Sequence, residues 1–157
     1  MLPELEPRVA ELNANQETFA RFLRGLNEAQ LNQRGVSEEY SARQTLAHLV
    51  GAEMSMLRMA KNWIAEQDNR LRPDFDLNFF NQRQQEKRAE QALDELLNDW
   101  QRAQREFVAL MEMLTQDDLE KRGDHPLEAD ITLRRLFIII TTHEAAHIRQ
   151  VMENVHA

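Results

Sequence analysis

The chain has 157 residues, of which 42% are apolar, and this is enough material for the core of a single domain. Its formal net charge of −8 and the lack of a basic stripe exclude a nucleic acid as the expected partner. The absence of cysteine excludes disulfides, thiolate metal ligands and a cysteine nucleophile, so a bound metal has to be held by His, Asp or Glu.

The N-terminal segment does not read as a targeting signal. Residues 1–12, MLPELEPRVAEL, are too acidic and too interrupted by Pro3 and Pro7 for a signal peptide. The longest apolar run, Leu136–Ile140, is too short to cross the roughly 30 Å hydrocarbon core of a membrane. We therefore expect a soluble, cytoplasmic protein with no membrane partner.

The first predicted helix begins after Pro7. Gly and Pro number only four each in the chain, which favours long helices and an all-α fold. Apolar residues then recur at intervals close to 3.6 or its multiples, so that one face of the helix is apolar. These residues are Val9, Leu12, Phe19, Leu23 and Leu26. The helix is expected to end near Asn27, or after one more turn at Gly35.

The second predicted helix begins after Ser41 and runs to about Gln67. Ser41 can cap the free N–H groups of the first turn, while Gln44 reaches back to the cap. Two neighbouring stripes follow the helix. One contains Leu46, Leu49, Glu53, Leu57 and Ile64, and the other contains His48, Ala52, Met56, Met59 and Trp63.

The third predicted helix is long, from Leu77 to Leu114. The segment RPDFDLNFFN interrupts the helical periodicity and reads as the loop that enters this helix. Its first half, NQRQQEKRAEQ, is so polar that we expect it to lie on the surface or to bend away. A turn-rich connection containing TQDDL and RGDHPLEADI follows, and we expect no strand in it.

The last predicted helix starts at the cap residue Thr132 and continues to about Asn154. Four helices of these lengths predict a four-helix bundle that forms one domain over residues 1–157. The core-facing stripe of the last helix steps by three or four residues. It contains Leu133, Leu136, Ile140, His143, His147 and Val151.

Two histidines therefore interrupt an apolar stripe, in the sequence HEAAH. Imidazoles at i and i+4 have Cβ atoms about 6 Å apart and can bind one ion. The alternative is that both histidines are ordinary hydrogen-bonded core residues. The i, i+4 spacing alone is weak evidence for a metal site. Two neutral imidazoles on one apolar stripe are hard to satisfy separately, however, and a shared metal removes that difficulty.

The sequence His143-Glu144-x-x-His147 also matches the metal-binding motif of zinc peptidases. We regard peptidase activity as the least supported function. Such an enzyme needs a further ligand well downstream and an edge strand that aligns the peptide. Only ten residues follow His147, and Glu153 and His156 among them cannot fold back around the ion. Upstream, His48 is more often a packed core residue when taken alone. A bundle that buries the stripe containing His48 and the stripe of the last helix brings His48 toward His143 and His147 as a third ligand.

Three segments together resemble the signature of the DinB/YfiT-like superfamily of metalloenzymes. They are YSARQTLAHLV at 40–50, FDLNFFNQ at 75–82 and HEAAHIRQV at 143–151, in the family's order across nearly the whole chain. The resemblance implies a four-helix bundle that binds a divalent metal, often nickel or zinc, through His48, His143 and His147. Tyr40 stands where a Trp is common in the family.

Other polar residues near these motifs have weaker claims to a role. Glu144 could orient a ligand or water, but a solvated surface Glu is the default. Asn81 could cap the loop or line the pocket, and Glu53 could enter the site or form a salt bridge. We read His125 and His156 as solvent-exposed.

Three neutral imidazoles leave a coordination position open, as in a reactive centre. The ion can then activate water or a thiol, and the resemblance adds low-molecular-weight thiols as cofactors. We expect a metal-dependent transferase or hydrolase that acts on a small-molecule electrophile. The alternative is a non-catalytic metal-binding or interaction module, which a sealed site would favour.

A homodimer is also expected. Its interface would use a face of the last helix that could equally be ordinary core. This face consists of Ile138, Thr141, Ala145, Ile148 and Met152.

Overall fold

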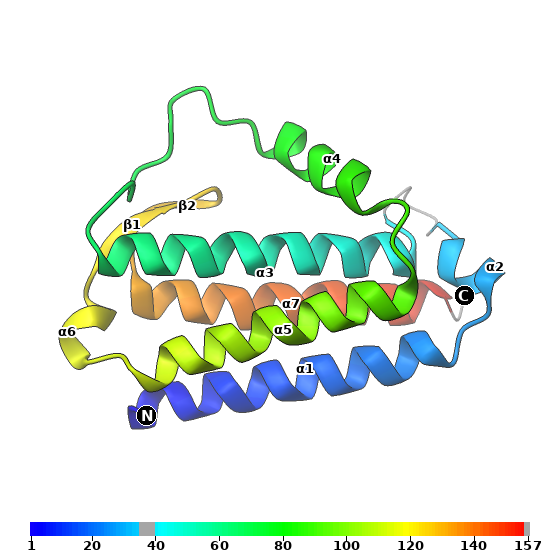
Figure 1. Cartoon of the computed structure of the whole chain (residues 1–157), viewed down its shortest axis with the longest axis horizontal. Coiled ribbons are helices and arrows are strands. Elements are labelled where there is room, and N and C mark those ends of the chain that lie inside the picture. Colours follow the sequence, from blue (N-terminus) through cyan, green and yellow to red (C-terminus); the bar gives the residue numbers. More distant parts are fainter. Residues whose placement is uncertain (35–39, 156–157) are drawn as a thin grey trace.

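Four long helices form the body of the protein in a computed structural model that describes residues 1–34 and 40–155. They are α1 (Glu6–Arg24), α3 (Ala42–Ile64), α5 (Leu93–Glu112) and α7 (Leu133–Val155). Figure 1 shows them packed side by side with their axes roughly aligned. The predicted four-helix bundle is therefore confirmed.

Shorter elements connect the long helices. They are a 3-10 turn (Pro3–Leu5), α2 (Glu28–Asn32), α4 (Leu77–Arg88), α6 (Gln116–Leu119), β1 (Arg122–His125) and β2 (Glu128–Thr132). The structure describes no helix long and apolar enough to span a bilayer.

The chain direction distinguishes this bundle from a simple up-and-down arrangement. Helix α3 contacts both α5 and α7, while α1 contacts α7 and α5. The crossover 65–92, which carries α4, returns the chain to the end of the bundle where α3 began, so α3 and α5 run parallel (Figure 1). Helix α7 runs antiparallel to α3, so the start of α3 faces the end of α7.

The predicted helix starts agree with the structure. Ser41 and Gln44 form the expected capping box at the start of α3. The Thr132 hydroxyl accepts a hydrogen bond from the Arg135 N–H at the start of α7, at 3.2 Å. The first helix ends at Arg24, somewhat before the predicted Asn27, and the alternative end at Gly35 lies outside the described residues.

The single long helix predicted from Leu77 to Leu114 is wrong, because α4 ends at Arg88 and α5 begins at Leu93. The expectation that the polar first half would leave the bundle is confirmed. Helix α4 packs on α3 and buries only Arg88, whereas α5 carries an apolar face into the core. A continuous helix could not do both, so the chain turns between them.

A β-hairpin of β1 and β2 lies where no strand was expected. Pro126 stands second in the tight turn that joins His125 to Glu128. Gly123 rests directly on the indole of Trp63 in α3, since a Cβ at this position would fall 2.1 Å from the ring. Asp124 accepts backbone hydrogen bonds from Leu71 and Asp130, which tie the hairpin to the crossover.

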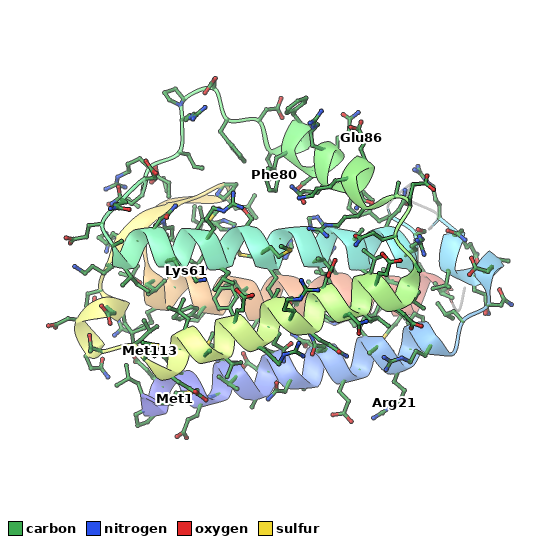
Figure 2. The ribbon with its side chains drawn as sticks, in the orientation of Figure 1. Met1, Arg21, Lys61, Phe80, Glu86 and Met113 are labelled. Carbon is green, nitrogen blue, oxygen red and sulfur yellow. The ribbon has the colours of Figure 1, made fainter. Side chains whose placement is uncertain are left out.

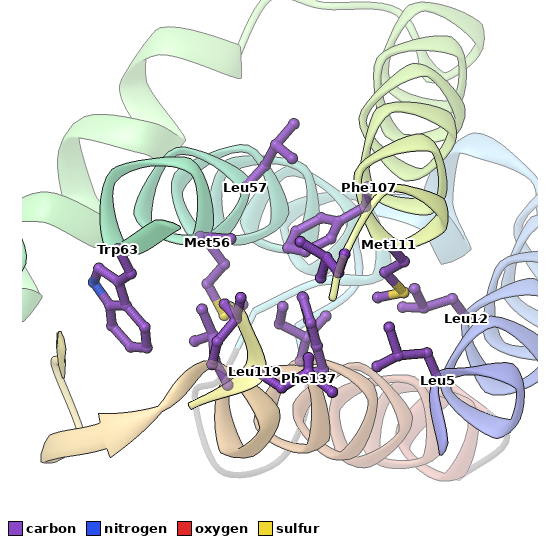
Figure 3. Packing of buried hydrophobic residues seen from close by; sticks show 14 residues of the cluster. Leu5, Leu12, Met56, Leu57, Trp63, Phe107, Met111, Leu119 and Phe137 are labelled. Atoms are coloured by element: carbon purple, nitrogen blue, oxygen red, sulfur yellow. The ribbon is translucent and has the colours of Figure 1, made fainter. Parts of the chain in front are cut away.

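The apolar core forms two clusters, one toward each end of the bundle. Figure 3 shows the first, in which Phe107 and Phe137 meet edge to face with ring centroids 5.9 Å apart. The second contains Phe19 and Trp100, also edge to face. Along each long helix a polar residue separates the two clusters. These residues are Asn15 on α1, Glu53 on α3, Gln104 on α5 and Glu144 on α7.

The face of α7 that was expected to serve a homodimer belongs partly to the core of the single chain. Thr141 and Ile148 are 3% and 5% exposed, so these two residues are not available to a partner, whereas Ile138, Ala145 and Met152 are half-buried. The homodimer stays a prediction.

Candidate metal centre

Three histidines from two helices meet between α3 and α7. His48 lies in the second turn of α3, whose start Ser41 fixes, and His143 and His147 occupy successive turns of the antiparallel α7. His48 is 95 residues from His143 in the sequence, and the predicted convergence of the three histidines is present.

The distances between the imidazole nitrogens fit a shared ion. The Nε2 atom of His143 lies 3.3 Å from Nε2 of His48 and 3.0 Å from Nε2 of His147. Metal–nitrogen bonds near 2.1 Å at angles between 90° and 109° require nitrogen separations of about 3.0–3.4 Å. Two of the three separations therefore match those of ligands on one divalent cation, and all three ligand atoms lie within 4.8 Å of one another.

Burial keeps two of these imidazoles, His48 and His143, neutral, as metal ligands must be. Desolvation, helped by the proximity of His147, lowers the pKa of His48 to about 4. Desolvation and the neighbouring histidines lower the pKa of His143 to about 3. Near pH 7 the Nε2 lone pairs of these two residues are available to a cation.

Hydrogen bonding within the described part of the chain leaves one nitrogen of the cluster without a partner. The Nδ1 atom of His143 is buried without a partner there. A proton on one Nε2 atom can form a hydrogen bond with only one of the neighbouring imidazoles. Lone pairs of two imidazoles then face each other. A cation that accepts all three lone pairs removes this conflict, so the donor set fits a metal.

A cavity of about 230 Å³ opens beside the three imidazoles. Its apolar wall includes Met59 of α3 and Phe80, which extends from α4 toward α3 (Figure 2). Its polar groups come from Tyr40, Ser55, Asn81 and His125, in addition to the histidines of the cluster. The site is therefore accessible to a small molecule.

The structure corrects the expectation that His125 is solvent-exposed. The side chain is half-buried and lines the cavity from the tip of the hairpin. The Leu127 N–H donates to Nδ1 of His125 at 3.1 Å, so the neutral ring carries its proton on Nε2. Burial lowers the pKa of His125, and Glu128 partly opposes this shift. Pro126 after His125 was the available signal for the turn.

Asn81 lies inside α4 and lines the cavity, and the side chain that caps α4 is that of Asp76. Tyr40 packs on His48 with ring centroids 5.5 Å apart. Burial raises the pKa of the Tyr40 hydroxyl, and a hydrogen bond from Gln85 partly opposes this. Both residues therefore border the cavity beside the histidines.

The expectation of a surface position for Glu144 is wrong, because this residue is 2% exposed. Its carboxylate accepts hydrogen bonds from Trp100 Nε1 at 3.2 Å and from Asn15 Nδ2 at 3.4 Å. Glu53 is equally buried and faces Glu144. Burial and the charge of Glu144 raise the pKa of Glu53 well above its usual value. Glu53 thus faces a second carboxyl group, and it takes neither of the two places expected for it, in the metal site or in a salt bridge.

The positions of Glu144 and His48 argue against a zinc peptidase. In the zinc peptidases with this sequence motif, the Glu of the motif acts as a base beside the metal. Here the Glu144 carboxylate points into the core toward Trp100. The third imidazole comes from His48, upstream of the motif.

Comparison with known proteins agrees with the fold. A sequence profile of the DinB superfamily matches residues 11–151. The uncharacterized protein YuaE of Bacillus subtilis is 24% identical, over 83% of this chain and 86% of that protein.

Two solved structures share the fold. The structure of YfiT from Bacillus subtilis, described as a probable metal-dependent hydrolase with an unusual four-helix bundle topology, superposes with a TM-score of 0.82. The identity is 18%, and the match covers 96% of this chain and 85% of YfiT. A mycothiol-dependent maleylpyruvate isomerase has a TM-score of 0.76 and 10% identity, over 94% of this chain and 60% of the isomerase.

Proposed function

The chain belongs to the DinB superfamily, and from this membership and its histidine cluster we propose that it is a divalent-metal-dependent enzyme. His48, His143 and His147 are its proposed metal ligands. Its proposed reaction is the activation of a thiol or water toward a small electrophile, as in a thiol transferase or a hydrolase.

The observation that carries this proposal is the convergence of three Nε2 atoms beside a cavity. Nickel and zinc both accept imidazole nitrogen, and they are the metals we propose. The description of YfiT as a probable metal-dependent hydrolase supports the use of water as nucleophile. The mycothiol dependence of the isomerase supports a low-molecular-weight thiol as the alternative.

The residues around the cavity suggest how a substrate is held. When bound, the divalent ion supplies Lewis acidity that makes water or a thiol a nucleophile near neutral pH. The neutral His125 ring offers its Nε2–H as a donor to an oxygen that gains negative charge. Asn81 and Ser55 offer further hydrogen bonds, and Phe80 excludes water from one wall.

The cavity favours an enzyme over a non-catalytic metal-binding module. A structural site surrounds its ion with protein, whereas this one borders about 230 Å³ of free space. That volume lies below the roughly 300–1,000 Å³ of sites for drug-sized ligands, so it suits a smaller substrate. The absence of cysteine is compatible with the reducing cytoplasm, where we propose that the protein works.

Metal analysis of the purified protein tests the ligand set. We expect about one divalent ion per chain in the wild type and loss of that ion in His48→Ala. His125→Ala is the matched control, because it removes a cavity histidine outside the proposed ligand set. Stoichiometric metal in His48→Ala would contradict the assignment of His48.

Turnover tests the enzymatic part. An activated ester reports hydrolysis, and an aryl halide with free cysteine as the thiol reports transfer. We expect at least one activity to require the metal and to be lost in His48→Ala. A protein that binds the metal but turns over neither probe would favour the non-catalytic module.

A further inference from the structure

A second cavity, of about 620 Å³, lies between α3, α4 and α5. Its lining shares no residue with that of the cavity beside the histidines. Helix α4 borders both cavities. Leu77, Phe80 and Asn81 face the histidine site, whereas Lys87 and Arg88 at the other end of the helix face this second cavity. We call it the α3–α5 groove, and Lys61 in Figure 2 lies along it.

The α3–α5 groove is positively charged in a protein whose net charge is −8. Its walls carry two carboxylates, and Asp99 is already bound to Arg102 at 2.8 Å. Glu106 lies 3.8 Å from Lys61. The cationic side chains outnumber the carboxylates. They are Arg58, Lys61, Lys87, Arg88 and Arg102. Such a concave cluster attracts anions, although the average surface repels them.

Arg88 is the buried cation of this cluster, with 6% of its side chain exposed. Its guanidinium lies 3.7 Å from the Asp99 carboxylate, too far for a hydrogen bond. Its other contacts are a 3.4 Å hydrogen bond to Gln91 and a 3.3 Å contact with the thioether of Met54. The Nε atom has no hydrogen-bond partner within the described residues. The Nε atom itself is out of reach of solvent, so a stronger acceptor in the groove would meet the terminal nitrogens, whose present contacts are weak.

The charge of Arg88 is only partly compensated by its neighbours. Burial lowers the pKa of the guanidinium, and the charge of Asp99 only partly opposes this. A guanidinium carries five N–H donors in a planar fork that matches the oxygens of a phosphate or carboxylate.

The floor of the groove is apolar. Leu57 and Ala103 contribute buried side chains, and Met54 borders the space beside Arg88. The volume is within the range of small-molecule sites, which run from about 300 to 1,000 Å³. A bare inorganic ion would leave most of this space and its apolar floor unused.

We propose that the α3–α5 groove binds a small organic anion. Its phosphate or carboxylate group pairs with the Arg88 guanidinium, and its apolar body lies on Leu57 and Ala103. The exposed cations at the rim, Lys87 and Arg102 among them, attract the anion and complete its charge balance. This site is separate from the proposed metal centre and does not depend on the function proposed for that centre.

Calorimetric titration with phenyl phosphate tests the proposal, with inorganic phosphate as the head group alone. We expect saturable binding of phenyl phosphate, weaker binding of inorganic phosphate, and a loss of about tenfold or more in affinity for Arg88→Gln. His48→Ala should bind phenyl phosphate like the wild type. Arg24→Gln is the charge-matched control, because it removes the same charge from an exposed position on α1.

Several results would overturn the assignment. They are the absence of saturable binding, equal affinity for the two phosphates, and binding that His48→Ala abolishes while Arg88→Gln leaves it intact. If Arg88→Gln does not fold, the double variant Lys87→Gln/Arg102→Gln replaces it, because both residues are exposed. Unchanged affinity in that variant, relative to Arg24→Gln, would equally contradict the proposal.

Discussion

Glu53 and Glu144 place two carboxyl groups inside the bundle, where one negative charge is already costly. Trp100 and Asn15 donate hydrogen bonds to Glu144. Both oxygens of Glu53, by contrast, have no hydrogen-bond partner among the described residues. A proton on Glu53 resolves the difference, because a protonated carboxyl can donate to the Glu144 carboxylate.

Glu53→Gln tests this protonation state. The pKa of Glu53 is raised in the folded state, so its stabilising contribution is complete below about pH 4.5 and is lost as pH rises toward the folded pKa. Between about pH 8 and 9 the histidines with lowered pKa are almost entirely neutral in both states, because their unfolded pKa is about 6.5. In this window we expect the free energy of unfolding to fall with pH in the wild type and to fall less in Glu53→Gln.

Urea denaturation at several pH values measures these slopes. Glu106→Gln on the exposed side of α5 is the control and should keep the wild-type slope. Identical slopes in the wild type and Glu53→Gln would show that Glu53 is ionised in the folded protein.

At the level of single residues, the sequence was informative where a spacing carried the signal. The His143 and His147 pair follows from the i, i+4 repeat, and His48 follows from its place on a second apolar stripe. The burial of Glu144 was missed because its donors, Trp100 and Asn15, come from two other helices. No local pattern reports such partners.

Among the secondary-structure elements, the β1–β2 hairpin determines where His125 lies. Gly123 allows β1 to lie flat against Trp63 at the end of α3. Asp124 holds the adjoining loop through Leu71, Asp130 and Arg70. The hairpin is therefore anchored just before the residue that reaches the cavity.

Gly123→Ala tests this anchoring. The added Cβ would meet the Trp63 ring at 2.1 Å, so the strand or the indole has to move. Overpacking of this kind costs about 1–3 kcal/mol, which thermal denaturation measures. Gly25→Ala is the matched control, because its Cβ would meet its nearest neighbour at an ordinary 3.5 Å. Equal melting temperatures for the two variants would exclude the proposed close packing.

The predicted elements were right where caps and periodicity agreed. Ser41 and Thr132 marked helix starts because their hydroxyl oxygens satisfy backbone N–H groups locally. The break between α4 and α5 was missed because residues 89–92 contain neither Gly nor Pro. The hairpin was missed because its strands are short and polar, and its packing on Trp63 is a tertiary contact.

At the scale of the whole molecule, the proposed metal would bind only the folded arrangement, because His48 and the α7 histidines are distant in the unfolded chain. A ligand at about 100 times its Kd stabilises the native state by about 2.7 kcal/mol. For a chain of this length, this corresponds to a rise in melting temperature of roughly 5–11 °C.

Differential scanning fluorimetry with nickel or zinc measures this rise. We expect the shift in the wild type and in His125→Ala, and no shift in His48→Ala. A comparable shift in all three proteins would place the stabilising ion somewhere other than between α3 and α7.

The crossover that makes α3 and α5 parallel also divides the proposed ligands. His48 precedes residues 65–92, and His143 and His147 follow them. A protease site engineered after the exposed Asp74 would leave two fragments, each with two of the four long helices and an incomplete ligand set. The proposed cation would then be coordinated by residues of both fragments and would link two separate polypeptides. Native mass spectrometry of the cleaved protein should detect the two fragments as one complex when the metal is bound. After chelation of the metal, a larger share of the fragments should be detected as separate species.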